Sequence, residues 1–263
     1  MEGGNLTPEV GHESQIADFA PIVFLNLQSF NLKSALTMLP ARFQPASDQS
    51  LLIYFGHAMS RKAHQQVMRL LRLLQADPVA GIVNLHPAYH SLLIKFDPLQ
   101  FAHADLESIL RERLKHLADI QPPPPRQIEI PVCYDEEFGP DLNHVAAMQH
   151  LTPEQVIELH ASKSYEVYFL GFVPGFAYLG ELAPELVTPR LPAPRRSVAS
   201  GSVGIAGSQT GVYPFAVPGG WRLLGRTPLK MFQPQTATSL LSIGDRVRFV
   251  PITREQFAQL EKA

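Results

Sequence analysis

The chain has 263 residues and a formal net charge of −2, with 45% hydrophobic and 17% charged residues. This length allows one large domain or two ordinary ones, and the hydrophobic content excludes an intrinsically disordered chain. The small net charge gives no overall reason to expect nucleic acid as a partner, so any electrostatic function has to be local.

Residues 1–41 are interpreted as an N-terminal extension, because the regular alternation of strands and helices begins at Arg42. The extension has neither the basic start of a secretory signal nor a long apolar run. We therefore expect a cytoplasmic protein that does not associate with membranes. Cys133 is the only cysteine of the chain, which agrees with a reducing compartment.

Residues 42–120 predict a small domain of their own. Four apolar runs are typical of strands, and two amphipathic segments with leucines three and four residues apart are typical of helices. Their order is β-β-α-β-β-α, which predicts a two-layer α+β domain with both helices on one side of the sheet. The elements are expected near Phe43 and at 50–56, 60–75, 82–85, 91–96 and 104–117.

The proline run at 121–125 predicts a stiff, extended linker, because successive prolines favour the polyproline conformation. The second domain then spans residues 126–263. Thr152, Pro153 and Gln155 indicate a helix start, with an N-cap, a proline at the first helical position and a capping box. Later short β-runs with tight turns are typical of a barrel or a sandwich. The expected elements are a strand at 128–133, helices at 141–148 and 253–262, and β-runs at 165–172, 202–207, 211–217, 221–226, 229–232 and 246–252.

The sequence contains no pattern that is typical of a metal site or of a catalytic nucleophile. None of the ten histidines follows His160, and Cys133 is the only thiol, so no Cys/His cluster has the spacing of a zinc site and no metal is predicted. Cys133 lies inside an apolar strand, where a buried and inert thiol is expected. No G-x-S-x-G elbow occurs, and no catalytic residue is assigned.

The glycine-rich segment 201–207 matches neither the dinucleotide-binding pattern nor the P-loop pattern, so it gives weak support for a nucleotide site. Two interpretations of its glycines stay open. Gly204 and Gly207 are candidates for a backbone loop whose amides approach a carboxylate or an amide. The alternative is that these glycines only allow the barrel to turn.

The strongest clue is the charge of residues 186–244, which include six Arg or Lys residues and no Asp or Glu. Guanidinium groups suit bidentate recognition of carboxylates and phosphates. We therefore predict that this segment binds an anionic ligand or an acidic partner surface. The anion-binding candidates are Arg190, Arg195 and Arg226, with Gln209, Thr210 and Thr227 to orient the ligand and Phe176, Tyr178, Tyr213 and Trp221 as pocket walls.

Several motifs in the same part of the chain, in one order, carry a family resemblance. They are GFVPGFAYL at 171–179, GSVGIAG at 201–207, PGGW at 218–221 and GRTP at 225–228. The chain resembles the family of the 5-oxoprolinase B subunit, which also contains the KipI-type inhibitor of a sporulation histidine kinase and was long labelled allophanate hydrolase subunit 1. The resemblance covers about residues 42–263. It implies a mainly-β, cyclophilin-like barrel after a small α/β domain.

The resemblance also implies a function that needs partners. It suggests the B subunit of an ATP-dependent 5-oxoprolinase, which opens 5-oxo-L-proline to L-glutamate together with a second cyclophilin-like subunit of the C type and a lactam-hydrolase-like subunit of the A type. ATP would then be bound at the level of the complex, and the isolated chain would be inactive. Two alternatives stay open: a non-catalytic inhibitor of a sensor histidine kinase, and a carboxyltransferase-type subunit of urea degradation.

Overall fold

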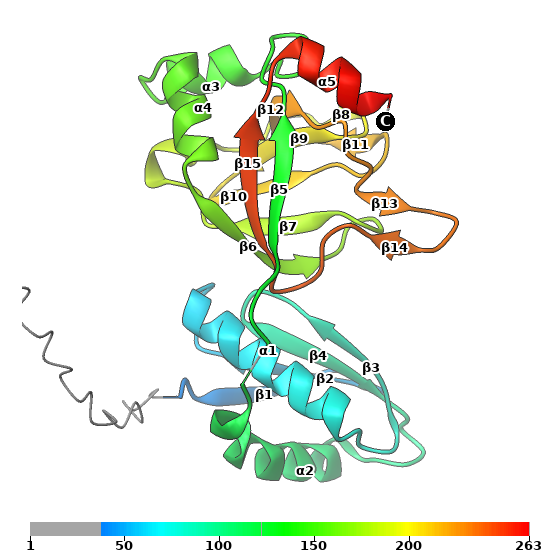
Figure 1. Cartoon of the computed structure of the whole chain (residues 1–263). Helices are drawn as coiled ribbons and strands as arrows, with labels where there is room; N and C mark the ends of the chain where they lie inside the picture. The colour runs from blue at the N-terminus through cyan, green and yellow to red at the C-terminus, as the bar shows by residue number, and fades with distance from the viewer. Residues whose placement is uncertain (1–37, 122, 263) are drawn as a thin grey trace, which may run out of the picture. The chain divides into compact units, whose positions relative to one another are not determined.

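The structure is a computed structural model that describes residues 38–121 and 123–262 (Figure 1). The first part of the chain forms a four-stranded antiparallel sheet in the order β1-β2-β4-β3. Helix α1 follows β2, and helix α2 follows β4. The elements are β1 Ala41–Ser47, β2 Ser50–Phe55, α1 Arg61–Ala76, β3 Ile82–Pro87, β4 Ser91–Phe96, α2 His103–Lys115 and a 3-10 turn, Leu117–Asp119.

Helix α1 shows why these residues form this element. The Ser60 hydroxyl accepts a hydrogen bond from the Ala63 amide at 3.1 Å and so caps the first turn. One face of the helix carries Val67, Leu70 and Leu74, which are buried in a core that includes residues of β2 and β4. The helix lies along this sheet (Figure 1). Burial of each such side chain contributes about 1.5–3 kcal/mol, which fixes the helix on the sheet.

The second part of the chain forms a seven-stranded sheet in the order β12-β9-β10-β7-β6-β15-β5. Its neighbouring strands are antiparallel, except that β15 and β5 pair in parallel. The strands are β5 Gln127–Val132, β6 Ser164–Leu170, β7 Ala177–Gly180, β9 Ser202–Ala206, β10 Gln209–Val212, β12 Arg222–Arg226 and β15 Arg246–Pro251.

The two outer strands of this sheet nearly close it into a barrel. Cys133, directly after β5, exchanges two backbone hydrogen bonds of 2.9 Å with Arg226 at the end of β12. A mixed α/β fold with a barrel-like sheet is thus confirmed, whereas the specific likeness to cyclophilin stays a prediction. The Cys133 thiol is buried, as expected, but it lies one residue past the strand and not inside it.

Three helices accompany the barrel: α3 Leu142–Met148, α4 Pro153–Ala161 and α5 Arg254–Glu261. The predicted capping box is present, because Thr152 Oγ1 accepts from the Gln155 amide and Gln155 Oε1 accepts from the Thr152 amide. Helix α4 therefore starts at the predicted residue. A 3-10 turn, Pro184–Leu186, and two short ribbons complete this part; their strands are β8 Arg195–Val198 with β11 Val217–Gly219 and β13 Phe232–Gln233 with β14 Thr238–Ser239.

His160, on α4, is fully buried in the barrel core and has both ring nitrogens bonded. Its Nε2 lies 2.9 Å from Thr210 Oγ1, whose own proton goes to the Gly204 carbonyl at 3.1 Å. The imidazole must therefore donate through Nε2 and accept at Nδ1 from the Tyr134 hydroxyl, 2.7 Å away. Burial lowers the pKa of His160 to about 3, so this histidine is a neutral part of the core.

Two predicted β-runs differ from the structure, and the prediction missed strands such as β7 and β8. The run 211–217 belongs to two strands, β10 and β11, because Pro214 between them has no amide proton for a ladder. The run 229–232 contributes only Phe232 to a strand. Strand β8 was not expected at all, since the prolines at 192 and 194 resemble a loop.

The predicted domain limits fall partly outside the described residues. The structure describes only residues 38–41 of the predicted extension, and there Leu39 donates to Gln66 Oε1 at 2.9 Å while Ala41 already starts β1. Residue 122 of the proline linker is not described, and its other residues form neither helix nor strand. The four-stranded sheet and the barrel each have a separate apolar core, yet the chain from Met38 on is one compact unit, so the division at 121–125 stays a prediction.

Candidate functional site

The four predicted wall residues come together in the structure as one aromatic cluster, Phe176, Tyr178, Tyr213 and Trp221. The Phe176 ring is central, with its centroid 4.9 Å from Tyr178, 5.2 Å from Tyr213 and 5.3 Å from Trp221. The pairs are tilted toward edge-to-face geometry, which is the favoured arrangement for aromatic rings. Tyr178 is half-buried and the other three are buried, so Tyr178 carries the exposed edge of the aromatic cluster.

Two glycines let the backbone come close enough for this packing. A Cβ on Gly219 would lie 2.4 Å from the Tyr213 hydroxyl, and a Cβ on Gly211 would lie 3.2 Å from the Trp221 ring. The first distance is impossible for any side chain, so Gly219 is required beneath Tyr213. The glycine richness of this part of the chain therefore serves ring packing as well as turns.

Sequence reasoning missed two further aromatic residues that extend the aromatic cluster. Phe169, on β6, stacks on Tyr178 with a centroid distance of 4.3 Å and an interplanar angle of 10°. Tyr89 follows β3 and meets Phe169 edge-on at 4.8 Å and Tyr178 at 6.3 Å. Tyr89 thus extends the aromatic cluster with a residue from the connection between β3 and β4 of the four-stranded sheet. No sequence signal links it to Tyr178, because 89 positions separate the two residues.

Arg190 is presented by a segment that is fixed on both sides. The Gly207 amide donates to the Thr188 carbonyl at 2.7 Å, and the Leu191 amide donates to the Gly220 carbonyl at 2.8 Å. Arg190 itself is exposed, and its guanidinium makes no ion pair or hydrogen bond with any residue of 38–121 or 123–262. Hydrogen bonds on both sides therefore hold the backbone around Arg190, and its guanidinium has no such partner in the described part of the chain.

The charge of Arg190 acts on three phenols around the aromatic cluster. Burial raises the pKa values of Tyr89, Tyr178 and Tyr213, and the positive charge of Arg190 opposes this rise at each of them. The phenols thus stay protonated at neutral pH and keep a proton to donate. A guanidinium that has no partner among the described residues, and whose charge acts on neutral phenols, can bind a small carboxylate.

Arg195, the second predicted anion-binding residue, already has a carboxylate partner. Its NH2 lies 2.8 Å from both oxygens of Asp141, and its NH1 donates to the Trp221 carbonyl at 3.2 Å. Asp141 is buried and also accepts from the Leu223 amide at 2.7 Å. Segment 186–244 offers Arg195 no carboxylate, and its partner lies 54 positions earlier in the chain. A ligand role for Arg195 stays a prediction.

Arg226 and Thr227 lie together at the end of β12, where the barrel nearly closes. Arg226 Nε donates to the Ser200 carbonyl at 2.8 Å, and its guanidinium carbon lies 5.9 Å and 5.8 Å from the ring centres of Phe138 and Phe257. Thr227 is buried, and its Oγ1 accepts from the Leu229 amide at 3.3 Å. The structure gives these residues local contacts, and a ligand role for them stays a prediction.

The remaining predicted site residues lie on or beside β9 and β10. Gln209 is half-buried at the start of β10, whereas Thr210 next to it uses its hydroxyl for His160 and Gly204 in the core. Gly204 lies inside β9, where a Cβ would be 3.2 Å from the Arg222 carbonyl oxygen. Gly207 forms the following turn with φ +55° and open space around it. Ligand contacts of these four residues stay predictions.

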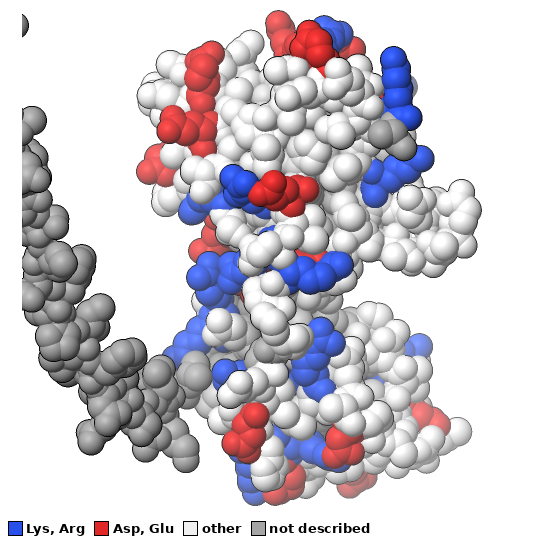
Figure 2. Space-filling model, viewed as in Figure 1, with Lys and Arg blue, Asp and Glu red and all other residues white. Residues whose placement is uncertain are grey.

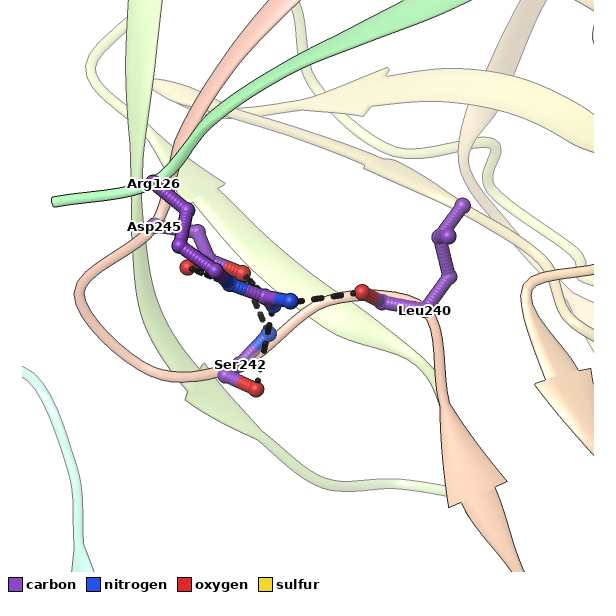
Figure 3. A network of polar contacts seen from close by, with 4 residues as sticks. All are labelled: Arg126, Leu240, Ser242 and Asp245. Atoms are coloured by element: carbon purple, nitrogen blue, oxygen red, sulfur yellow. Dashed lines mark hydrogen bonds and ion pairs between the residues drawn. The ribbon is translucent and has the colours of Figure 1, made fainter.

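A cavity of about 660 Å³ lies away from the aromatic cluster, among α1, the proline linker and the segment before β15. Two of its charged groups form the network of Figure 3, in which Arg126 makes a bidentate ion pair with Asp245. Arg126 also donates to Ser242 Oγ at 3.2 Å and to the Leu240 carbonyl at 3.3 Å. This ion pair connects the residue before β5 with the turn before β15, so it stabilises the fold.

Glu166, another charged residue of this cavity, lies between two arginines. Glu166 is buried, and its Oε2 lies 3.0 Å from Arg246 NH2 and 3.7 Å from Arg61 Nε. Burial raises the pKa of Glu166, while the two arginines lower it. His64 is buried 3.9 Å from Glu166 Oε1, and burial lowers its pKa to about 4. Two arginines of the cavity wall, Arg126 and Arg246, are thus paired with its two carboxylates, Asp245 and Glu166.

The chemistry of the aromatic cluster is that of a binding site. The aromatic cluster, its neighbours Tyr89 and Phe169, and Arg190 supply flat walls, phenols and a cation, but no carboxylate, imidazole or thiol to act as a general base. In residues 38–121 and 123–262, no three His, Cys, Asp or Glu side chains are placed to hold a metal ion. None of the helices in the same ranges is long and apolar enough to cross a membrane.

Comparison with known proteins gives a consistent family assignment. Residues 41–242 match the family described as carboxyltransferase domain, subdomain C and D. The 5-oxoprolinase B subunit of Escherichia coli O157:H7 is 57% identical over 213 residues, which cover 80% of this chain and 96% of that protein. The 5-oxoprolinase B subunit of Bacillus subtilis strain 168 is 40% identical over 227 residues, which cover 82% of this chain and 95% of that protein.

Solved structures extend the comparison to longer chains. The crystal structure of TTHA0988 superposes with a TM-score of 0.68 at 38% identity and covers 78% of this chain, but the match spans only 40% of TTHA0988. The Kluyveromyces lactis urea carboxylase superposes with a TM-score of 0.69 at 20% identity, over 84% of this chain and 22% of that chain. The second likeness shows a shared fold.

Proposed function

The chain belongs to the family of the 5-oxoprolinase B subunit, and from this premise we propose that it serves as the B subunit of an ATP-dependent 5-oxoprolinase. The complex opens 5-oxo-L-proline to L-glutamate. The observation that supports this most strongly is the identity with known B subunits over almost their whole length. The chain's own part in the reaction is to bind and orient the substrate.

The surroundings of Arg190 suit this substrate. 5-Oxoproline is a small lactam ring that carries one carboxylate, so it needs a cation for the carboxylate and a flat apolar wall for the ring. Arg190 supplies a guanidinium without a partner among residues 38–121 and 123–262, and Tyr178 at the edge of the aromatic cluster supplies the wall. The Tyr89 and Tyr178 hydroxyls, kept protonated by burial, can donate to the lactam carbonyl.

ATP is assigned to another member of the complex. The glycines of segment 201–207 serve the barrel: Gly204 lies against the Arg222 carbonyl oxygen in β9, and Gly201 adopts φ +81° in a turn against the Thr227 carbonyl oxygen. Strand β10 follows this segment directly, so the segment does not lead into a helix N-terminus at which backbone amides would receive a phosphate. The partners proposed are a second cyclophilin-like subunit and a lactam-hydrolase-like subunit.

The test is reconstitution with the other 5-oxoprolinase subunits of the same organism. ADP and glutamate release are measured with 5-oxoproline present or absent, for the full complex and for a mixture that lacks this chain. The expected result is substrate-dependent release of both products only when this chain is present. Full turnover without the chain would overturn the proposal.

Two further measurements on the tagged chain address the two alternatives. Recovery of a sensor histidine kinase with the tagged chain, with no 5-oxoproline-dependent ADP release, would favour the inhibitor. Carboxylation of urea by a complex containing the chain would favour the urea-degradation role. Either outcome contradicts the function proposed here.

A further inference from the structure

The cavity among α1, the proline linker and the segment before β15 has the dimensions of a ligand site. Its volume of about 660 Å³ falls in the usual range for pockets that hold small molecules. The cavity shares no residue with the aromatic cluster or with Arg190. Figure 2 shows basic side chains where the linker joins the four-stranded sheet to the barrel, which is the region of this cavity. A ligand here would occupy a second site of the chain, separate from the one proposed for 5-oxoproline.

The cavity wall before β15 is held in place by backbone hydrogen bonds. The Gly244 amide donates to the Val167 carbonyl at 2.9 Å, and the Arg246 amide donates to the Arg126 carbonyl at 2.8 Å. A Cβ on Gly244 would lie 3.6 Å from Met68 Cε, so this wall lies directly against α1. The cavity is therefore preformed, and little conformational entropy is lost when it takes up a ligand.

Helix α1 supplies a cation to the cavity. Gln65, Met68 and Arg72 line the cavity at spacings of three and four, so they share one face of the helix. The Arg72 guanidinium donates to Gln75 Oε1 at 3.2 Å, but it makes no ion pair with any residue of 38–121 or 123–262. Arg72 can therefore bind an anionic group of a ligand, to which a guanidinium is well suited.

A second surplus of positive charge lies around the buried Glu166. Its Oε2 lies 3.0 Å from Arg246 NH2 and 3.7 Å from Arg61 Nε, so two guanidiniums share one carboxylate. The neighbouring His64 is uncharged at neutral pH, because burial lowers its pKa to about 4. Glu166 Oε2 accepts no hydrogen bond from the residues that the structure describes. This corner of the cavity thus combines an excess cation with an acceptor for an N–H group.

The rest of the wall narrows the class of ligand. Arg126 and Asp245 neutralise each other in their bidentate ion pair, so they add no net charge. Residues 123–125 of the proline linker and Ile243 present apolar surface to the cavity. Two surplus cations and an apolar wall match a small organic molecule with two carboxylates and a short aliphatic body, and Glu166 matches an amino group.

We propose that this cavity binds a small dicarboxylic amino acid, with one carboxylate at Arg72 and the other beside Arg246. Glu166 accepts a hydrogen bond from the amino group of the ligand. The ligand class is taken from the charges of the cavity wall, so the inference goes beyond the proposed function and does not rest on it. L-Glutamate belongs to this class and is also the product of the reaction proposed above.

The test is isothermal titration calorimetry of L-glutamate with the purified full-length chain and three variants. Arg72→Gln removes the cation of the cavity, Lys62→Gln removes an exposed cation of the same helix outside the cavity, and Arg190→Ala alters the surroundings of the aromatic cluster. Thermal unfolding checks that each variant folds. Wild type, Lys62→Gln and Arg190→Ala are expected to bind alike, and Arg72→Gln at least about tenfold more weakly. L-Glutamine, in which an amide replaces one carboxylate, is also expected to bind wild type at least about tenfold more weakly.

Several outcomes would overturn the inference. No measurable binding of L-glutamate up to about 10 mM, or equal affinity in Arg72→Gln and wild type, would overturn the site. Loss of binding in Arg190→Ala with retention in Arg72→Gln would place L-glutamate near the aromatic cluster and overturn it as well. Equal affinity for L-glutamate and L-glutamine would overturn the dicarboxylic class.

The measurement needs no turnover, so it separates this inference from the proposed function. Binding that depends on Arg72, in a chain whose reconstituted complex shows no 5-oxoproline-dependent ADP release, would support the cavity site and contradict the function. Turnover by the complex, together with L-glutamate binding that is absent or independent of Arg72, would support the function and contradict the cavity site.

Discussion

Two polar regions of the barrel differ in how their charges are matched. Asp141 and Arg195 form a partly buried ion pair that also binds the backbone of Leu223, and His160 in the barrel core has both nitrogens bonded. Arg190, five positions before Arg195, is exposed and has no ion-pair or hydrogen-bond partner among the described residues of 38–262. Paired groups of this kind hold a fold together, whereas an unpaired cation on a rigid segment is available to a ligand.

The largest expected effect on stability concerns the ion pair between Arg195 and Asp141. Arg195→Ala leaves the buried Asp141 carboxylate without its ion-pair partner. We expect the free energy of unfolding to fall by about 2–4 kcal/mol, below the full range for buried pairs because Arg195 is 28% exposed. Urea denaturation measures it, with the exposed Arg196→Ala on the same strand as control. A loss below about 0.5 kcal/mol, as at an ordinary surface site, would contradict the structural role.

The second effect is a loss of stability in acid caused by the buried histidines. Burial lowers the pKa values of His160 to about 3 and His64 to about 4, so below pH 6.5 the unfolded chain binds protons that the folded chain excludes. Stability therefore falls as the pH drops from 6.5 toward these values, by up to about 1.4 kcal/mol per histidine per pH unit. Glu166, whose pKa burial raises, acts in the opposite direction as it takes up a proton.

This pH dependence is measured by urea denaturation at about pH 7.5 and about pH 5.5, on either side of the ordinary pKa of histidine. The groups around His64 are Glu166 on β6, with Arg246 and Arg61 beside it, and the Tyr168 ring at 4.8 Å. A His64→Gln variant is expected to show a smaller difference between the two pH values than wild type. An unchanged difference would show that His64 is not the group that titrates.

A smaller effect is expected for Thr210→Val, which removes the hydroxyl between His160 and the Gly204 carbonyl while keeping the shape of the side chain. Two buried groups lose a hydrogen-bond partner, which costs about 1–3 kcal/mol. Thermal or urea unfolding gives the value, and Thr236→Val at an exposed position is the control. Wild-type stability in the Thr210 variant would mean that the buried network is not needed for the fold.

The smallest stability effect is expected at Arg190. Arg190→Ala removes an exposed side chain that makes no hydrogen bond or ion pair with the described part of the chain, so the free energy of unfolding should change by less than about 0.5 kcal/mol. Urea denaturation beside the Arg195→Ala variant makes the comparison within one experiment. A loss of similar size in both variants would remove the distinction between the two regions.

Local signals in the sequence carried much of the fold. The Thr152 capping box and the leucine spacing of α1 are patterns of residues close together in the sequence. Helix α4 begins at the predicted residue, and α1 spans Arg61–Ala76 where the sequence predicts 60–75. The mixed fold with a barrel-like sheet likewise follows from short β-runs between glycine and proline turns. The pairing of strands that are distant in the sequence cannot be predicted in this way. Nothing in the sequence shows that Arg246 on β15 pairs in parallel with Gln127 on β5, far earlier in the chain.

The candidate site shows the same limit. Composition selected Arg190 and the four rings of the aromatic cluster, because cations without local carboxylates and aromatic residues among glycines are visible in one segment. Composition could not show that Arg195 is paired with a carboxylate, because its partner Asp141 precedes helix α3 and lies outside that segment. Tyr89 was missed for the same reason, as its contacts depend on tertiary packing.

The central claim is that Arg190 binds the substrate carboxylate while Arg195 holds the fold. The most direct measurement is kcat/KM for 5-oxoproline in reconstituted complexes that contain wild type, Arg190→Ala or the control Arg196→Ala. Loss of a charge-assisted hydrogen bond is worth about 1.5–3 kcal/mol, so the Arg190 variant should lose about 10- to 100-fold in kcat/KM with unchanged subunit assembly. Wild-type kcat/KM in Arg190→Ala would contradict the account.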